Sequence, residues 1–135
     1  MTLPDETKYC LESNFIIALL RGKGNAIQVY EEIKNSPLAV ASIASVALFE
    51  ILRGKEQNQE KIGRFEELRQ KLEVLPFGER EAEEASEIEK AVHLKGLTIG
   101  SLDLLIGATA KTNGAVLISN DSDYQRIDGL LLRTY

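Results

Sequence analysis

Residues 100–124 read GSLDLLIGATAKTNGAVLISNDSDY, an apolar helical pattern followed directly by a short apolar strand pattern. The apolar spacing predicts a helix over 101–113, capped by Ser101 and ended near Gly114, and then a buried strand over 115–119. A short strand that is apolar on both faces is typical of a parallel sheet with helices on either side. This stretch therefore favours the α/β class.

The rest of the chain repeats this alternation of short strands and helices. An apolar helical pattern follows the first predicted strand, and Ser13 or Asn14 is expected to cap that helix. In chain order the sequence also predicts strands at 8–12, 38–42, 74–77 and 130–134, helices at 25–35, 44–53, 56–73 and 79–95, and a helical turn at 121–127. We expect a single domain over residues 1–135, with a three-layer α/β/α fold around a parallel sheet of about four to five short strands.

The composition is that of a globular protein without a disulfide framework. Of the 135 residues, 44% are hydrophobic and 27% are charged, and there is one cysteine. No apolar run is long enough to cross a membrane, and the opening MTLPDETK lacks the pattern of a signal peptide, so we expect the cytoplasm. The net charge of −5 argues against nucleic-acid binding through bulk positive charge, although a bound metal ion would reverse the sign locally.

Three acids follow the ends of predicted strands. Glu12 ends the first strand, and Asp121 and Asp123 come directly after the strand at 115–119. In parallel sheets, binding sites form beyond the carboxyl ends of the strands. A purely structural interpretation also exists, with Glu12 as a cap of the next helix and Asp121 in an Asx-type turn.

Two more acids interrupt apolar helices. Glu50 lies in VALFEILRG at 46–54, and Asp103 lies in the first turn of the helix at 101–113. A glutamate among apolar residues is rarely buried unless it is paired or bound to a metal. The alternatives are an exposed position for Glu50 and a favourable interaction of Asp103 with the helix dipole.

Taken together, these acids predict one divalent-metal site. A parallel sheet brings Glu12, Glu50, Asp103 and Asp121 to the same edge, where unpaired carboxylates repel one another unless a cation binds. Ligands that are all oxygen favour Mg²⁺ or Mn²⁺ over zinc. The sequence contains no phosphate-binding loop or serine-hydrolase motif, and His93, the one histidine, is interpreted as a surface or helix-end residue.

The order of these motifs resembles the PIN domain family, and within it the VapC toxin ribonucleases. The likeness runs through nearly the whole chain. It rests on LESNFII at 11–17, LFEILRG at 48–54, IGSLDLLIGA at 99–108 and LISNDSDY at 117–124, and VLPF at 74–77 also matches a habit of the family. The resemblance implies metal binding by Glu12, Glu50, Asp103 and Asp121, with Asp123 as a fifth ligand and Asn14 and Ser119 as supporting polar residues.

Two positions depart from the family pattern. The first acid is normally Asp and is Glu12 here, which moves the carboxylate outward by about one bond, whereas productive metal geometry tolerates an error of only about 0.5 Å. A Ser or Thr common three positions before the second acid is Ala47 here, so one polar support is missing. Glu12 therefore favours a weakened metal site, a preference for Mn²⁺, or an inactive form.

The resemblance implies a divalent-metal-dependent endoribonuclease that hydrolyses RNA phosphodiester bonds as the toxin of a VapBC-type pair. Its partners would be RNA, a VapB-type antitoxin bound across the helices at 15–35 and 44–72, and a second copy in a homodimer. Arg53 shares a helix face with Glu50, and Arg21 shares one with Asn14. These two arginines are candidate contacts to the RNA backbone, and the alternative is that both are solvated.

Two other classes of function are alternatives. A catalytically weakened PIN-like module that binds RNA or a protein partner would explain Glu12. A phosphotransfer α/β domain is disfavoured. A receiver needs acids clustered at the first strand and a haloacid-dehalogenase-like phosphatase needs Asp-x-Asp after it, whereas Asp121-Ser122-Asp123 comes late in the chain.

Overall fold

The structure is a computed structural model that describes residues 6–54 and 59–135. Within these residues, five parallel strands form one sheet in the order β3-β2-β1-β4-β5. They are β1 (Thr7–Leu11), β2 (Ala39–Ala44), β3 (Glu73–Leu75), β4 (Val116–Ile118) and β5 (Leu131–Arg133). The predicted α/β class and the parallel sheet are confirmed.

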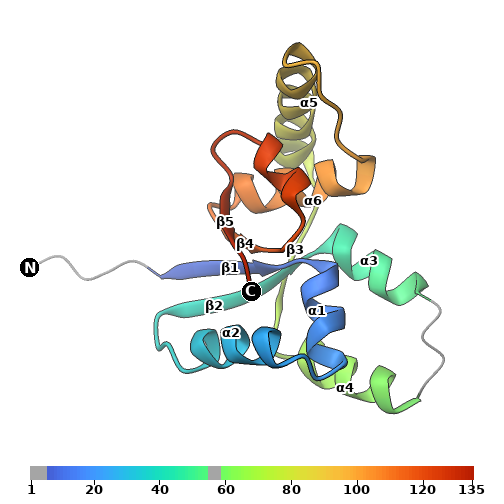
Figure 1. The fold of residues 1–135 in the computed structure, drawn as a ribbon, viewed down its shortest axis with the longest axis vertical. Helices are drawn as coiled ribbons and strands as arrows, with labels where there is room; N and C mark the ends of the chain where they lie inside the picture. Colours follow the sequence, from blue (N-terminus) through green and yellow to red (C-terminus); the bar gives the residue numbers. More distant parts are fainter. Residues whose placement is uncertain (1–5, 55–58) are drawn as a thin grey trace, which may run out of the picture.

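Helices cover both faces of the sheet, which gives the expected three layers (Figure 1). On one side lie α1 (Ser13–Leu20), α2 (Gly24–Lys34) and α4 (Gln59–Arg69), on the other lie α5 (Glu79–Leu94) and α6 (Ser101–Thr112), and α3 (Ser45–Arg53) extends from the end of β2. A 3₁₀ turn, η1 (Ser122–Arg126), follows β4. No helix of the described residues is long and apolar enough to span a bilayer.

The largest difference from the predicted elements falls on the helix expected at 56–73. In the structure α4 runs from Gln59 to Arg69, and the first three residues of the predicted helix, 56–58, lie outside the described residues. After Arg69 the chain tightens into turns, in which the Lys71 amide donates to the Leu68 carbonyl at 2.9 Å. The strand expected at 74–77 stops at Leu75, because Pro76 has no amide to donate and the next amide bonds to a side chain.

The predicted serine caps are wrong. The N-cap of α1 is Glu12 and that of α6 is Gly100, and neither has a side-chain cap hydrogen bond. Ser13 and Ser101 are instead the first residues inside their helices. The Ser13 hydroxyl donates to Oε1 of Glu50 at 2.7 Å, so a contact with α3 replaces the local cap.

The topology places the ends of β1 and β4 side by side. Leu11 pairs with Ile118, and the Glu12 amide extends that pairing with a bond of 3.3 Å to the Ile118 carbonyl. On its other edge β1 pairs with β2, which leads into α3. The segments that follow β1, β2 and β4 therefore leave the sheet at a common edge, as the sequence predicted.

A close approach between η1 and α6 completes this corner of the molecule. At Gly107 of α6 an added Cβ would lie 2.4 Å from Cδ1 of Ile127, a distance that no other residue type tolerates without a shift. The ring of Tyr124 packs beside it and is fully buried. Gly107 therefore lets η1 pack directly on the helix that carries Asp103. Cys10 is also fully buried in the core.

Candidate metal centre

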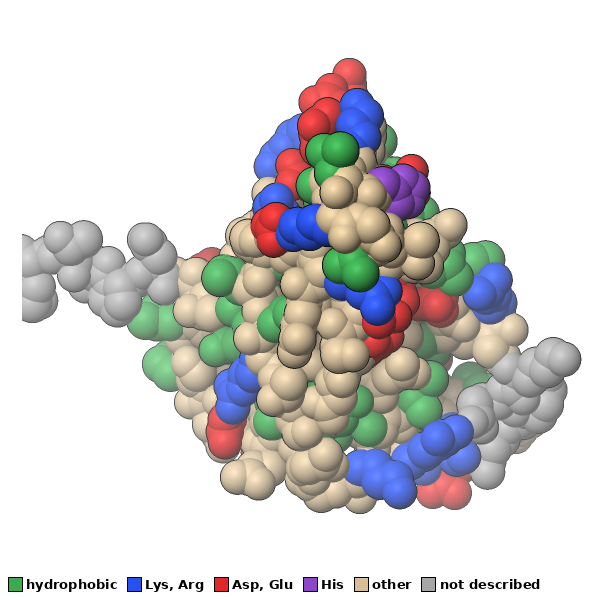
Figure 2. Space-filling model, turned by 45° about the horizontal axis from the view of Figure 1, so that its top comes forward, with side chains coloured by type: hydrophobic (Ala, Val, Ile, Leu, Met, Phe, Trp, Pro, Cys, Tyr) green, Lys and Arg blue, Asp and Glu red, His purple; other side chains and the backbone are tan. Residues whose placement is uncertain are grey.

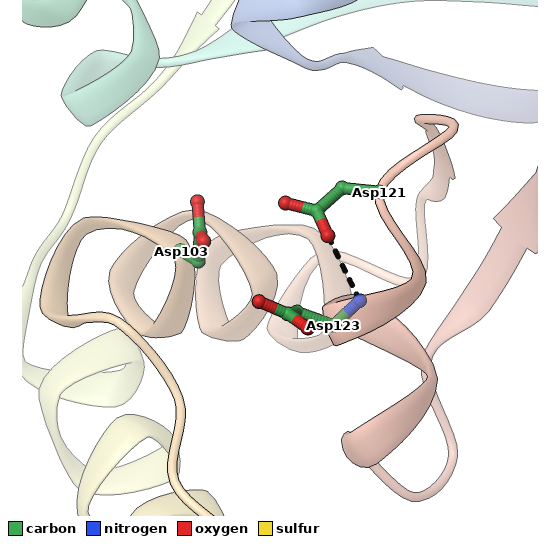
Figure 3. A group of neighbouring side chains, drawn as sticks. All are labelled: Asp103, Asp121 and Asp123. Carbon is green, nitrogen blue, oxygen red and sulfur yellow. Dashed lines mark hydrogen bonds between the residues drawn. The ribbon is translucent and has the colours of Figure 1, made fainter.

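Three aspartates from two segments meet at the carboxyl edge of the sheet. Asp103 comes from the first turn of α6, and Asp121 and Asp123 come from the turn that follows β4. One carboxylate oxygen of each lies within 4.8 Å of the others, and all three side chains are partly buried. Figure 3 shows the carboxylates of Asp121 and Asp123 directed toward the first turn of α6, from which the Asp103 carboxylate projects. We call this group the three-Asp cluster.

Asp121 serves the local backbone and the cluster at once. It is the N-cap of η1, and its Oδ1 accepts the Asp123 amide at 2.9 Å (Figure 3). The Asx-type turn considered as a structural alternative is therefore present. This bond orients the Asp121 carboxylate without excluding it from the cluster, because a carboxylate has two oxygens and several lone pairs.

Asp103 is the member of the cluster that burial affects most clearly. Burial raises its pKa, the Tyr124 hydroxyl opposes that rise by donating to Oδ1 at 3.2 Å, and the charges of Asp121, Glu50 and Asp123 raise it further. Burial also raises the pKa of Tyr124 itself, which therefore remains a donor. An acid surrounded by other acids in this way is what a bound cation would stabilise.

Glu12 lies deeper than the three-Asp cluster and does not belong to it by distance. Its side chain is 3% exposed, and its Oε2 accepts the Ser119 hydroxyl at 3.3 Å. Burial raises the pKa of Glu12 from 4.5 to about 7, while the Asn14 amide and Ser119 lower it and the Asp103 charge raises it. The buried Glu12 is thus within electrostatic reach of the cluster.

Glu50 of α3 lies between the acids and an apolar groove. Its carboxylate accepts the Ser13 hydroxyl, and its charge acts on both Glu12 and Asp103. Ala47 is fully buried in the core and has no hydroxyl to offer, whereas Ser13 gives Glu50 a polar partner from another helix. Sequence reasoning missed this role of Ser13, although it directly follows Glu12.

The polar and basic residues predicted near the acids lie in different surroundings from one another. The Ser119 hydroxyl donates to Glu12 and accepts the Asp121 amide at 3.0 Å, and its supporting role in the site stays a prediction. Asn14 is exposed, and its backbone amide rather than its side chain acts on Glu12. Arg21 lines the apolar groove together with Glu50, and Arg53 stacks on the Phe49 ring, with Cζ 4.9 Å from the centroid.

The surface at the exposed end of α5 carries charges of both signs (Figure 2). Figure 2 shows acidic and basic side chains mixed around the exposed end of α5 instead of gathered into one basic surface, in keeping with the net charge of −5.

Two further polar residues that the sequence did not single out, Tyr124 and Arg126, contact the cluster. Tyr124 is the last residue of the motif LISNDSDY at 117–124, whereas Arg126 lies two residues beyond it and carried no signal of its own.

The residues of the cluster fit a divalent cation. The donors are carboxylate oxygens, the ligands that Mg²⁺, Mn²⁺ and Ca²⁺ prefer, and the described residues around them offer no thiolate or imidazole that would favour zinc. A divalent cation bound by these carboxylates would place positive charge at an otherwise negative edge of the sheet.

Known proteins are similar to this chain in sequence. The family model for the PIN domain matches residues 9–130. The chain is 33% identical over 131 residues to Ribonuclease VapC1 of Rickettsia felis, covering 92% of this chain and 93% of that protein. It is also 33% identical over 129 residues to Ribonuclease VapC of Rickettsia bellii, with coverage of 92% and 93%.

Solved structures agree on the fold. The structure of VapBC-1 from nontypeable Haemophilus influenzae superposes with a TM-score of 0.82 at 24% identity, covering 95% of this chain and 98% of that chain. VapBC2 from Rickettsia felis, bound to a DNA fragment from its promoter, gives 0.81 at 23% identity with coverage of 96% and 99%. At these identities the likeness concerns the fold.

Proposed function

This chain belongs to the PIN domain family, and we propose that it is an endoribonuclease of the VapC type, the toxin of a VapBC pair. The observation that carries the proposal is the three-Asp cluster, with Glu12 and Glu50 beside it, at the carboxyl edge of the sheet. The substrate is RNA, and we expect the protein to work in the cytoplasm. The single domain over residues 1–135 stays a prediction.

Asp103, Asp121 and Asp123 would hold a divalent ion, Mg²⁺ or Mn²⁺, and Glu12 and Glu50 would complete its surroundings directly or through water. When bound, such an ion supplies Lewis acidity, which makes water a stronger acid and stabilises negative charge on a phosphate. In this assignment Asp123, and not Glu12, is the third direct ligand, because Asp123 lies within the cluster and Glu12 lies outside it.

The remaining polar groups fix the acids in place. Hydroxyl groups of buried residues donate to each of these acids: Tyr124 to Asp103, Ser119 to Glu12, and Ser13 to Glu50. A site of this kind reacts well when its groups are held to within about 0.5 Å of productive geometry. Glu50, which also lines the groove beside the site, would orient the attacking water.

An apolar groove beside Glu50 is the proposed binding site of a VapB-type antitoxin. It has a volume of about 220 Å³ and lies between α1, α3 and α4. Apolar side chains line it, among them Ile17, Leu20, Leu52 and Ile62, and the last two are 54% and 47% exposed. An amphipathic segment of the antitoxin that buries these residues would also cover the entrance at Glu50. The protein would form a homodimer, as the family resemblance implies.

The test is cleavage of a structured RNA in Mg²⁺ or Mn²⁺. Asp103→Asn is expected to lower the rate by more than about 100-fold, since even partners of metal ligands cost 10–100-fold when lost. Asp128→Asn is the matched control, because Asp128 is exposed and pairs with Lys95 away from the cluster. Removal of the ion with a chelator should abolish cleavage. Equal rates for wild type and Asp103→Asn would refute the proposal.

A catalytically weakened module is the second candidate. The observation that favours it is the buried position of Glu12, outside the three-Asp cluster. Glu12→Asp distinguishes the two, because a shorter carboxylate restores the usual first acid of the family. If this variant cleaves RNA and wild type does not, the chain is the weakened form.

A further inference from the structure

One side chain joins the two segments that carry the three-Asp cluster. Arg126 of η1 donates through Nη1 to the carbonyl of Thr98 at 2.6 Å, and its Nη2 lies 3.3 Å from Oδ1 of Asp123. Thr98 belongs to the loop between α5 and α6, five residues before Asp103. The guanidinium therefore connects the approach to Asp103 with the carboxylate of Asp123.

The connection acts where the position of α6 is determined. Gly100 is the N-cap of α6, and the Leu104 amide donates to its carbonyl at 2.8 Å, so the loop that contains Thr98 sets where the first turn begins. Asp103 stands in that turn. A shift of the loop relative to η1 would therefore change the separation between Asp103 and Asp123.

The planar guanidinium suits this task in a way that an ammonium does not. Its five N–H donors have a fixed fork geometry, so one edge can serve a carbonyl while another serves a carboxylate. The three donors of a lysine ammonium radiate from one nitrogen on a flexible stem, so they do not span two separated acceptors in a fixed plane as a guanidinium does. Arg126 is about one-third exposed, so the two contacts hold a side chain that would otherwise be mobile.

We propose that Arg126 is a positioning residue that sets the spacing between Asp103 and Asp123 and thereby the affinity of the three-Asp cluster for its divalent ion. The inference rests on the proposed function, because it concerns the same cluster. Arg126 acts through Asp123 and the loop at Thr98 and does not itself bind the ion.

The decisive variant is Arg126→Lys, which keeps the charge and removes the fork. Mn²⁺ affinity, measured by calorimetric titration of the folded protein, is expected to fall about 10-fold, the range found when partners of metal ligands are lost. Arg126→Gln is a second variant in case the first does not fold, because its amide can still donate to the Thr98 carbonyl. The same direction of change is expected for it.

Two controls match the chemistry and the location. Arg69 forms the same i,i+3 pair at 3.3 Å with Glu66 on α4, so Arg69→Lys tests the loss of an arginine pair elsewhere. Lys95 pairs with Asp128 at 2.8 Å and links the same two regions without touching the cluster, so Lys95→Ala tests a general loosening of this corner. Both controls are expected to keep the wild-type Mn²⁺ affinity.

Three outcomes overturn the inference. The first is an unchanged Mn²⁺ affinity in Arg126→Lys, and the second is an equal loss of Mn²⁺ affinity in either control. The third is an unchanged Mn²⁺ affinity in Arg126→Gln together with weakened RNA binding, which would make Arg126 a contact to RNA. These outcomes differ from failure of the proposed function, in which the wild-type protein itself neither binds Mn²⁺ nor cleaves RNA.

Discussion

The Ser119 hydroxyl lies 3.3 Å from Oε2 of Glu12, although the two residues are 107 positions apart in the chain. The same hydroxyl accepts the backbone amide of Asp121. One serine therefore couples the acid that ends β1 to the segment that carries two of the three clustered aspartates.

Removing this hydroxyl is expected to shift the pH at which the metal binds. Ser119 lowers the pKa of Glu12, so Ser119→Ala raises it and leaves Glu12 more protonated at about pH 7. Mn²⁺ affinity should fall about 10-fold near neutral pH and largely recover near pH 9. Ser42→Ala is the control, because Ser42 is buried in β2 and bonds to the Tyr9 carbonyl. A loss of equal size at both pH values would contradict the coupling.

The metal-free protein is expected to lose stability as the pH rises from about 5 to 8. Burial raises the pKa of Glu12 from 4.5 to about 7, so in this range the folded protein holds a proton that the unfolded chain has released. The contribution is fully present below the unfolded pKa, is lost as the pH rises through the folded pKa, and amounts to about 3 kcal/mol for a shift of this size.

Glu12→Gln tests this dependence, because a glutamine does not ionise. Denaturant unfolding at the two pH values in the presence of a chelator should show a much smaller change for the variant than for wild type. Glu89→Gln, at an exposed position on α5, should keep the wild-type change. If Glu12→Gln loses as much stability as wild type over this range, another group is responsible.

Ser13→Ala is expected to lower the rate of RNA cleavage about 10-fold while metal affinity changes less. The Ser13 hydroxyl holds Glu50 at 2.7 Å, and Glu50 is assigned to orient the attacking water. Loss of an orienting partner commonly costs 10–100-fold. Single-turnover cleavage measures the effect, with Ser86→Ala on the exposed face of α5 as control. Wild-type cleavage by Ser13→Ala would remove Glu50 from this role.

Asn120→Ala is expected to weaken Mn²⁺ binding and lower the melting temperature together. The Asn120 side chain bonds the Tyr135 carbonyl and amide, both at 2.8 Å, and stands between Ser119 and Asp121. Asn113→Ala removes another bond from an asparagine to the backbone, at 2.7 Å from the Thr109 carbonyl, at the far end of α6. That control should lower the melting temperature and leave Mn²⁺ affinity unchanged.

Leu52→Glu is expected to weaken antitoxin binding at least about 10-fold and leave RNA cleavage intact. Leu52 lines the groove and is already 54% exposed, so a charge there costs little folding energy but opposes an apolar partner. Leu94→Glu is the control, since Leu94 is 89% exposed at the end of α5. Binding of a co-expressed VapB-type antitoxin measures the effect. Equal binding by both variants would show that the antitoxin binds outside this groove.

The arrangement of the acids could be predicted because it follows from topology. Glu12 and Asp121 end adjacent parallel strands, and the alternation of short apolar strands with helices already indicates such a sheet. Which acids belong to the cluster could not be predicted, because membership depends on how deeply each side chain is buried and on how η1 packs against α6, and both are set by tertiary packing.

The supporting residues were harder to identify for a related reason. Ser13 looked like a helix cap because capping is a local property, whereas its actual partner, Glu50, lies 37 residues away. The pairing of Arg126 with Asp123 is visible as an i,i+3 spacing, but its bond to the Thr98 carbonyl depends on how the loop before α6 lies against η1. Contacts of this kind exist only once tertiary packing is complete.

The wide separation of the site residues along the chain has a consequence for synthesis. Glu12 is made early, whereas Asp121 and Asp123 follow after more than four-fifths of the 135 residues. At about 5–20 residues per second, the interval is on the order of ten seconds. During that time a nascent chain lacks two of the three clustered carboxylates and the β4 edge that pairs with β1. On the proposed assignment of these aspartates, the nascent chain would cleave no RNA beside the ribosome until residues 119–126 have emerged and folded.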